Sequence, residues 1–306
     1  MDEDNVLTSS MDNTLLEREQ SILDMQAWRG VFKEGADAGD GEAIAIKEPR
    51  DVTAVLTPVD AKGLIGSTSR LGPDAFEIVW MPSPAGDLPN AECEAEAWFN
   101  RAATPRRRSI VRAGTRTARV FWCEGRALIY CKAPQLHDTL DGVVRFALTE
   151  RETVTLERAM KTVWAAIDED KSLTHAVTPG QQKHQKHVNK MTELVVQMKS
   201  GQMRIETALE QLDPTLAEPS KRLYGELAIA AGLYDRAPRL GEPVQFASDH
   251  YELANTRLIE AKNATTERTN FLIGHTLESL IIVLLLGELA ALLYEIHMFY
   301  DFSAGP

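Results

Sequence analysis

The pattern of hydrophobic positions is most informative at the end of the chain. Residues 277–300 read LESLIIVLLLGELAALLYEIHMFY, an apolar run interrupted by Glu288 and Glu295. About 20 mostly apolar helical residues cross the ~30 Å hydrocarbon core of a bilayer. The block SLIIVLLLG is apolar on every side of a helix, whereas a helix docked on a soluble core keeps a polar face. The run therefore predicts one C-terminal transmembrane helix.

A buried core helix at the end of a soluble domain is the alternative interpretation of this run. Glu288 supports the alternative, because an ionisable group near the middle of a bilayer costs roughly 3 kcal/mol and usually faces a partner. Gly287 and Ala291 offer a close-packing face beside it, and Tyr294 suits an interfacial aromatic belt. The hypothesis of membrane anchoring and helix pairing rests on Leu280, Ile281, Leu284, Gly287, Glu288, Ala291 and Tyr294.

Residues 134–276 carry hydrophobic positions at helical spacing, which predicts an all-helical region. We expect Ser220 to cap one of these helices and Pro238 and Pro243 to close it. The clearest stripe, with members three or four residues apart, consists of Leu156, Ala159, Met160, Val163, Trp164 and Ile167.

The last helix of this region is expected to begin near Asp249 and to continue into the apolar run without a break. Residues 251–261 hold a heptad-like seam that is typical of a coiled coil and favours self-association. A continuous helix would hold the preceding body at a set distance from the bilayer.

Residues 43–133 show the period-two pattern of strands. The short runs AIAIK, VTAVL, FEIVW and SIVRA are β-branched or aromatic, and ARVFWCE followed by GRALIYCK predicts a hairpin with Glu124 and Gly125 in its turn. The segment AECEAEAWFNRAA predicts a helix capped by Asn90. Together these patterns predict a small mixed α/β domain.

The predicted fold class is therefore α+β, with a small mixed N-terminal domain, an all-helical region and one transmembrane helix. The glycine- and acid-rich run GVFKEGADAGDG, residues 30–41, reads as a flexible linker. The expected regions are an acidic N-terminal helix and linker (1–42), the α+β domain (43–133), the helical domain (134–276) and the anchor (277–300).

Composition narrows the functional classes. The 306-residue chain has a formal net charge of −12, which argues against general affinity for nucleic acids. Its start lacks the basic and apolar parts of a signal peptide, so we expect the body to stay where it is made. Cys93, Cys123 and Cys131 are odd in number and lack metal-ligand spacing, which favours unbonded core thiols in a reducing compartment.

Basic residues nevertheless gather in one segment and form a candidate anion-binding surface. Anionic lipid headgroups or an RNA backbone would suit such a surface. The alternative is a solvated loop and strand edge, paired with the acidic N-terminal segment. The candidate residues are Arg106, Arg107, Arg108, Arg112, Arg116 and Arg119.

Signatures of catalysis are lacking in the sequence. His184 and His187 have helical i to i+3 spacing, but no third ligand accompanies them. Nucleotide loops, GxSxG and HExxH are missing. We therefore expect a non-enzymatic protein with no cofactor, no metal and no small-molecule substrate. An enzyme of unrecognised type is the rival, and a pocket lined by His175, His184 or His250 would favour it.

The C-terminal half resembles the family named for being required for meiotic nuclear division. The resemblance is carried by the residues of KRLYGELAIAAGLYDRAP, by VFWCEG, and by Asn255, Thr256, Arg257, Leu258, Leu277, Glu278, Ile281, Ile282 and Glu288. It implies a membrane-tethered protein with an α/β N-terminal half and no established catalytic residues. The acidic start differs from a mitochondrial presequence, so the resemblance favours a bacterial cytoplasmic-membrane relative over a protein of the mitochondrial inner membrane.

The combined interpretation is a single-pass scaffold or tether with a cytoplasmic body that self-associates. Its expected partners are the lipid bilayer and a second copy of the chain, with anionic lipid or RNA at the arginine surface. Arg257, Lys262 and Arg268 precede the anchor and Asp301 follows it, consistent with the body inside. An RNA- or ribosome-associated module that uses residues 106–119 is the other rival.

Overall fold

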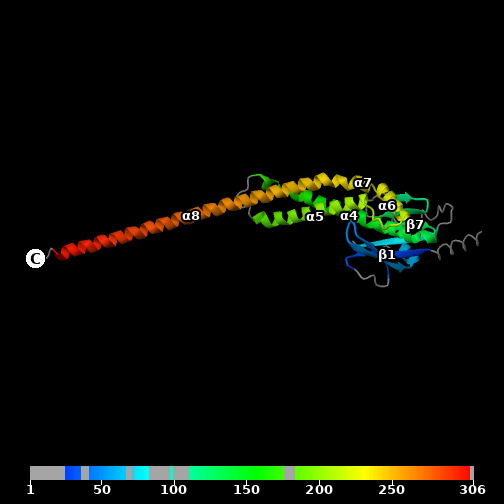
Figure 1. Cartoon of the computed structure of the whole chain (residues 1–306), viewed down its shortest axis with the longest axis horizontal. Helices are drawn as coiled ribbons and strands as arrows, with labels where there is room; N and C mark the ends of the chain where they lie inside the picture. The colour runs from blue at the N-terminus through cyan, green and yellow to red at the C-terminus, as the bar shows by residue number, and fades with distance from the viewer. Residues whose placement is uncertain are drawn as a thin grey trace, which may run out of the picture. The chain divides into compact units, whose positions relative to one another are not determined.

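The structure, a computed structural model, describes residues 25–35, 41–66, 71–72, 74–82, 97–98, 110–175 and 183–303. Its fold class is α+β: a mixed sheet is followed by a long helical region that ends in one apolar helix (Figure 1). The prediction of fold class is confirmed.

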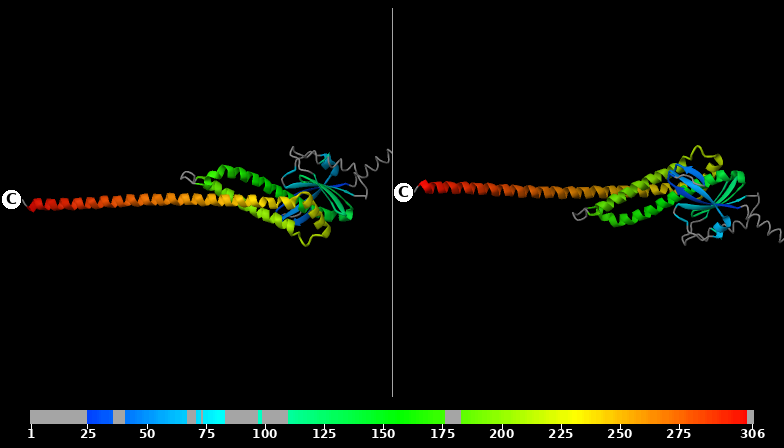
Figure 2. Two further views of the ribbon diagram at one scale, coloured as in Figure 1. Left: turned by 90° about the horizontal axis from the view of Figure 1, so that it is seen from above. Right: turned by 90° about the horizontal axis from the view of Figure 1, so that it is seen from below.

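Seven strands form the sheet, in the spatial order β2-β3-β1-β4-β7-β6-β5. Neighbouring strands are antiparallel except for the parallel pair β4 and β7. Figure 2 shows them as one twisted sheet. The strands are β1 (Gln26–Lys33), β2 (Glu42–Ile46), β3 (Val52–Val59), β4 (Ala75–Pro82), β5 (Val111–Gly114), β6 (Ala118–Cys123) and β7 (Arg126–Cys131).

Strand β1 corrects the predicted linker, because it occupies the start of the glycine-rich run and pairs with both β3 and β4. Gly30 lies within the strand because the ring of Phe76 lies over it; a Cβ at Gly30 would be 2.0 Å from that ring. Phe32 is buried beside the same ring, with centroids 4.8 Å apart. Glycine at this position therefore reflects close packing and not flexibility.

The predicted hairpin of β6 and β7 is confirmed. Glu124 and Gly125 form its turn with φ values of 45° and 85°, the left-handed conformation of a two-residue hairpin. Cys123 is paired in register with Arg126, and Cys131 lies at the far end of the hairpin. Both thiols are unbonded and buried, as predicted, and burial raises the pKa of Cys123 to about 11. Cys93 lies outside the described residues.

Different elements pack on the two faces of the sheet. On one face Trp122 meets Phe146 of helix α4 (Leu136–Asp170), with ring centroids 5.4 Å apart. On the other face a hydrophobic cluster combines strand residues with Leu64 of the short helix α2 (Ala61–Gly66) and with Trp98. Only residues 97–98 of the predicted helix in AECEAEAWFNRAA are described, and they are helical.

The predicted helical stripes merge into fewer, longer helices. After the 3₁₀ turn η1 (Ala133–Gln135), α4 takes in the stripe expected between Leu156 and Ile167 and the 20 residues that precede it. The remaining elements are η2 (Lys171–Thr174), α5 (Gln185–Glu210), α6 (Glu218–Ala230), α7 (Leu233–Arg236), η4 (Pro238–Leu240) and α8 (Gly241–Ser303).

Three predicted helix boundaries are wrong. The last helix, α8, begins at Gly241 and not near Asp249. Ser220 is fully buried within α6 and does not cap it; the N-cap is Ala217, because Pro219 in the first turn starts the helix earlier. Pro243 does not close a helix but lies in the first turn of α8, where its missing N–H costs no helical hydrogen bond.

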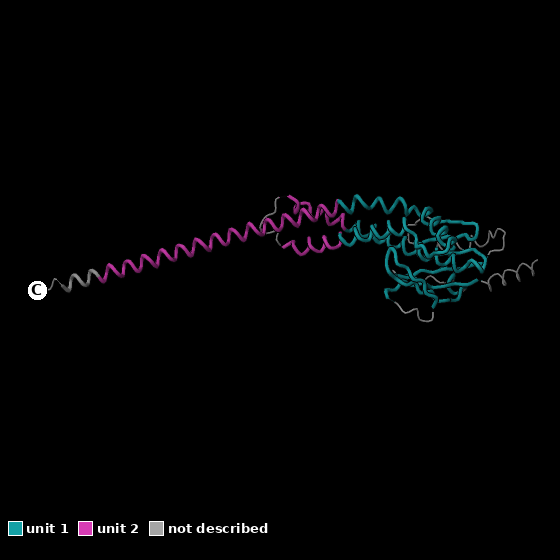
Figure 3. The backbone as a smooth tube through the Cα atoms, in the orientation of Figure 1, with its two compact units in different colours: residues 1–162, 196–245 teal, residues 163–195, 246–306 magenta. Residues whose placement is uncertain are grey.

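The chain divides into two compact units (Figure 3). Unit 1 comprises residues 1–162 and 196–245 and contains the sheet; unit 2 comprises residues 163–195 and 246–306. The four regions expected from sequence stay a prediction, since the units divide α4, α5 and α8 internally.

Candidate membrane anchor

Helix α8 carries the candidate membrane-spanning segment. Within α8, 18 consecutive residues reach a mean hydropathy of 2.1 with no part buried, and among the described residues it is the one helix long and apolar enough to cross a membrane. Its large apolar side chains between Phe271 and Tyr294 are 48% to 67% exposed, so no face of this segment is buried against the parts of the chain that the structure describes. This property favours a lipid environment over a protein core.

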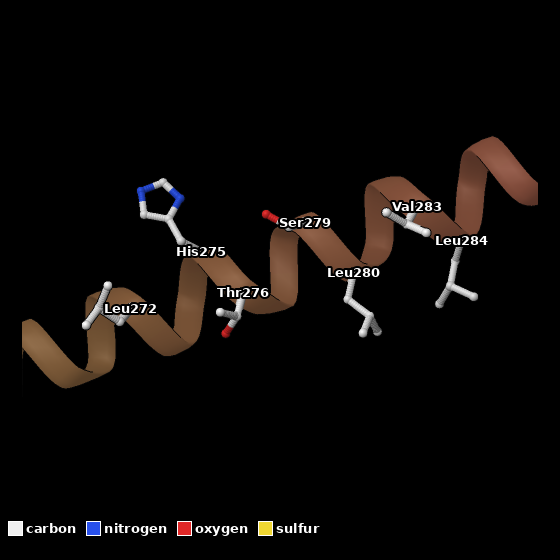
Figure 4. A pocket seen from close by; sticks show the side chains of 7 residues that line it. All are labelled: Leu272, His275, Thr276, Ser279, Leu280, Val283 and Leu284. Carbon is white, nitrogen blue, oxygen red and sulfur yellow. The ribbon is translucent and has the colours of Figure 1, made fainter.

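Polar groups at the start of the apolar segment are satisfied within the helix. The Thr276 hydroxyl donates to the carbonyl of Ile273 at 2.8 Å. His275 packs edge-on against Phe271, with centroids 4.4 Å apart, and its Nδ1 lies 3.5 Å from Glu278 Oε2. Figure 4 shows this stretch of α8, with His275 and Ser279 on one side and Leu280 on another. Polar groups that find their partners within the same helix need no water, as a helix in hydrocarbon requires.

The predicted anchor residues all lie on the exposed surface of α8. They fall into two groups around the helix. Leu280, Gly287 and Tyr294 repeat at seven-residue spacing, whereas Ile281, Leu284, Glu288 and Ala291 form a separate stripe. A Cβ at Gly287 would meet no atom within 4 Å. Helix pairing through either stripe stays a prediction.

Before the apolar segment, α8 packs in unit 2 through the seam predicted from sequence. Tyr251, Ala254 and Leu258 are buried, and the exposure of α8 rises beyond them. The Tyr251 hydroxyl donates to Asp170 Oδ2 at 3.1 Å. Burial, and secondly the Asp170 carboxylate, raises the pKa of Tyr251. The seam therefore joins the anchor helix to a folded bundle.

His187 packs in this bundle against the end of α4. Its Nε2 lies 2.9 Å from Asp170 Oδ2, at the end of α4. Near it, the Gln185 amide donates to Asn255 Oδ1 at 2.7 Å. In the part of the chain that the structure describes, no group of three or more His, Cys, Asp and Glu side chains is arranged to hold a metal ion. Sequence reasoning missed Asp170 because its partners are remote in the chain.

His250, another histidine considered from the sequence, lies beside Tyr251 on α8. Its ring centroid is 5.2 Å from that of Tyr251 and 6.4 Å from that of Phe246. Burial lowers the pKa of His250, partly offset by Asp170. The enzyme alternative that invoked His175, His184 or His250 stays a prediction.

A row of charged side chains crosses the sheet of unit 1. Glu77 on β4 is opposite Arg29 on β1 and Arg126 on β7. Glu77 Oε1 accepts from Arg29 Nη2 at 3.0 Å, and Glu77 Oε2 lies 3.1 Å from Arg126 Nε. Arg126 also donates to the carbonyl of Trp98 and lies 5.1 Å from its ring centroid. The sequence signal for this row was a glutamate inside the buried run FEIVW.

The arginine surface is described only in part. Arg106, Arg107 and Arg108 lie outside the described residues. Arg112, Arg116 and Arg119 are exposed, and the Arg112 guanidinium lies 5.9 Å from the ring centroid of its cross-strand partner, Phe121. Because side chains two residues apart share a sheet face, Arg119 points to the same face as Phe121 and Arg112. Binding of anionic lipid or RNA by this surface stays a prediction.

Comparisons with known proteins add little. A scan against protein-family models gave no match. A search of curated proteins gave no match either. Among solved structures, one described as the structure of the full-length CmaX protein is similar over 82% of each chain, with 12% identity and a TM-score of 0.35. A likeness of this strength carries no conclusion about this chain, and the resemblance to the family required for meiotic nuclear division stays a prediction.

Proposed function

We propose that this chain is a non-enzymatic, single-pass membrane protein that acts as a scaffold or tether and self-associates. Its body lies on the cytoplasmic side of the membrane, and the chain is a bacterial-type relative of the family required for meiotic nuclear division. The proposal rests on the continuity of α8. This one helix packs in unit 2 through Tyr251–Leu258 and continues without a break into an exposed apolar segment.

The stretch of α8 between bundle and anchor supports a tether. Among the α8 residues whose burial is described, Leu258 is the last that is buried. Leu277 lies 19 residues further on, which corresponds to roughly 28 Å of helix at about 1.5 Å per residue. The threonine hydroxyls of this stretch donate to carbonyls of the preceding turn, as Thr265 does to Ala261 at 2.8 Å. The stretch is helical throughout and exposed except at Ala261 and Thr265, which are partly buried. It suits a semi-rigid spacer that holds the body off the bilayer.

Charge supports the orientation. Arg257, Lys262 and Arg268 precede the apolar segment, and the described part of the chain beyond Glu295 contains no lysine or arginine. Positive residues close to a span favour the cytoplasmic side. This bias supports an orientation with the body on the cytoplasmic side.

Membrane fractionation tests the proposal. The full chain and a version ending at Asn270 are expressed, and membranes are washed with high salt and then with alkaline carbonate. We expect only the full chain to resist both washes, because the shorter version lacks the apolar segment. A version ending at Tyr300 is the matched control and should stay in the membrane. Release of the full chain by carbonate would contradict an integral anchor.

A further inference from the structure

Two of the three carboxyl groups of residues 277–300, those of Glu288 and Glu295, lie on one side of α8. Starting at Gly274 and alternating steps of three and four residues, one reaches Glu288 and Glu295 on a single stripe. In an α-helix this spacing keeps side chains on one face. We call this face the anchor stripe; its members are Gly274, Leu277, Ile281, Leu284, Glu288, Ala291 and Glu295.

The position of Glu288 demands a partner within the bilayer. It lies near the middle of residues 277–300, where a charged side chain costs roughly 3 kcal/mol. Across the described residues, α8 is the one helix able to span, so no other described segment supplies a group at that depth. A partner for Glu288 therefore comes from another molecule in the membrane.

The folded part of unit 2 leaves this side of α8 open. Tyr251, Ala254 and Leu258, which α8 buries in its bundle, lie roughly 100° to 160° around the helix from Glu288 when each residue is counted as a turn of about 100°. Positions that line up with Glu288 on the same count, Glu252 and Ile259, are exposed. The bundle thus covers one side of α8 and does not obstruct an approach to the other.

We infer that the anchor stripe is the surface through which two copies of this chain pair in parallel, with Glu288 at the centre of the interface. Copies inserted in the same orientation carry Glu288 at the same depth, so the two carboxyls face one another across a twofold axis. A facing pair of carboxyls can share one proton, which gives each a hydrogen-bonding partner. This inference rests on the proposed function and specifies its self-association.

Cysteine cross-linking in membranes tests the stripe in the full chain. Leu277→Cys, Ile281→Cys, Leu284→Cys and Ala291→Cys place single thiols on it, and Ser279→Cys, Val283→Cys, Leu286→Cys and Ala290→Cys are matched controls on the opposite face. The parent chain, whose Cys123 and Cys131 are buried, gives the background. We expect disulfide-linked dimers several-fold more abundant at stripe positions, because a disulfide needs Cβ atoms about 4 Å apart. Equal cross-linking on both faces, none at any position, or a maximum on the control face would overturn the inference.

Substitution of Glu288 tests its place in the interface. In the Leu284→Cys background, Glu288→Gln should keep the cross-link, since an amide can still hydrogen-bond across the interface. Glu288→Leu should reduce the cross-link roughly threefold, the usual worth of one interhelical hydrogen bond in a membrane. Ser279→Leu, which removes a polar group from the other face, is the control and should change nothing. An unchanged or increased cross-link in Glu288→Leu would contradict the central role of Glu288.

Carbonate extraction of every variant separates the two proposals. If the chains wash off, the membrane anchor fails and the pairing inference falls with it. If the chains resist extraction but cross-link no more at the stripe positions than at the control positions, the anchor stands and only the pairing inference fails.

Discussion

Replacing Leu284 and Leu285 together with lysine is expected to release the chain from the membrane into the carbonate wash. The eleven Leu, Ile and Val residues from Leu277 to Leu293 contribute roughly 3–7 kcal/mol to insertion at about 0.3–0.6 kcal/mol each. Two central lysines cost about 5–7 kcal/mol on the same scale. The balance therefore turns against insertion, all the more because Glu288 already opposes it.

Quantitative immunoblotting of the carbonate pellet and supernatant measures this release. The matched control replaces Glu267 and Asn270 with lysine; both are exposed and precede the apolar segment, so the control should stay in the pellet. Retention of the Leu284→Lys, Leu285→Lys chain in the pellet would show that this segment does not enter the hydrocarbon.

Replacing Glu77 with glutamine is expected to destabilise unit 1 by about 3–5 kcal/mol, the usual cost of breaking a buried ion pair by removing one partner. The side chains of Glu77 and Arg126 are 1% and 2% exposed, so Arg126 would keep a buried charge without its carboxylate. Arg29 has a side chain that is 47% exposed and can turn toward water, so the loss of its contact with Glu77 should cost less. The carbonyl of Trp98 accepts from Arg126 but offers no charge.

Urea unfolding of the detergent-solubilised full chain, followed by tryptophan fluorescence, measures this effect, because Trp28, Trp80 and Trp122 all lie in the sheet. Glu34→Gln is the control: that carboxylate is 77% exposed and lies 4.0 Å from Arg50, so its loss should cost less than about 0.5 kcal/mol. A Glu77→Gln chain within 1 kcal/mol of the parent, on the scale of an ordinary surface substitution, would contradict the structural importance of the charged row.

The parts of the fold that depend on local pattern were accessible from sequence. Alternation of apolar residues and the turn signal at Glu124 and Gly125 predicted the hairpin, and the apolar run predicted a helix able to span a membrane. The linker prediction was wrong at Gly30 because glycine is enriched both in linkers and where an aromatic ring crosses a strand, and only the position of Phe76 separates the two cases.

Polar pairs that join remote segments were not accessible. Nothing in the sequence near Asp170 indicates that His187 and Tyr251 contact it, because these contacts depend on how three helices pack. The same holds for Glu77 and Arg126, which meet because β4 and β7 pair in parallel. Helix lengths were also underestimated, since loss of a clear stripe in the middle of α4 does not interrupt its backbone hydrogen bonds.

The measurement that tests the account most directly is thiol labelling along α8 in intact membranes. Single cysteines replace Lys262, Arg268, Ile281 and Leu285 in the full chain, and a water-soluble maleimide is added before or after detergent. We predict rapid labelling at 262 and 268, and protection at 281 and 285 until detergent is added, because hydrocarbon excludes the reagent and the water that carries it. Equally rapid labelling at all four positions in intact membranes would contradict the membrane anchor.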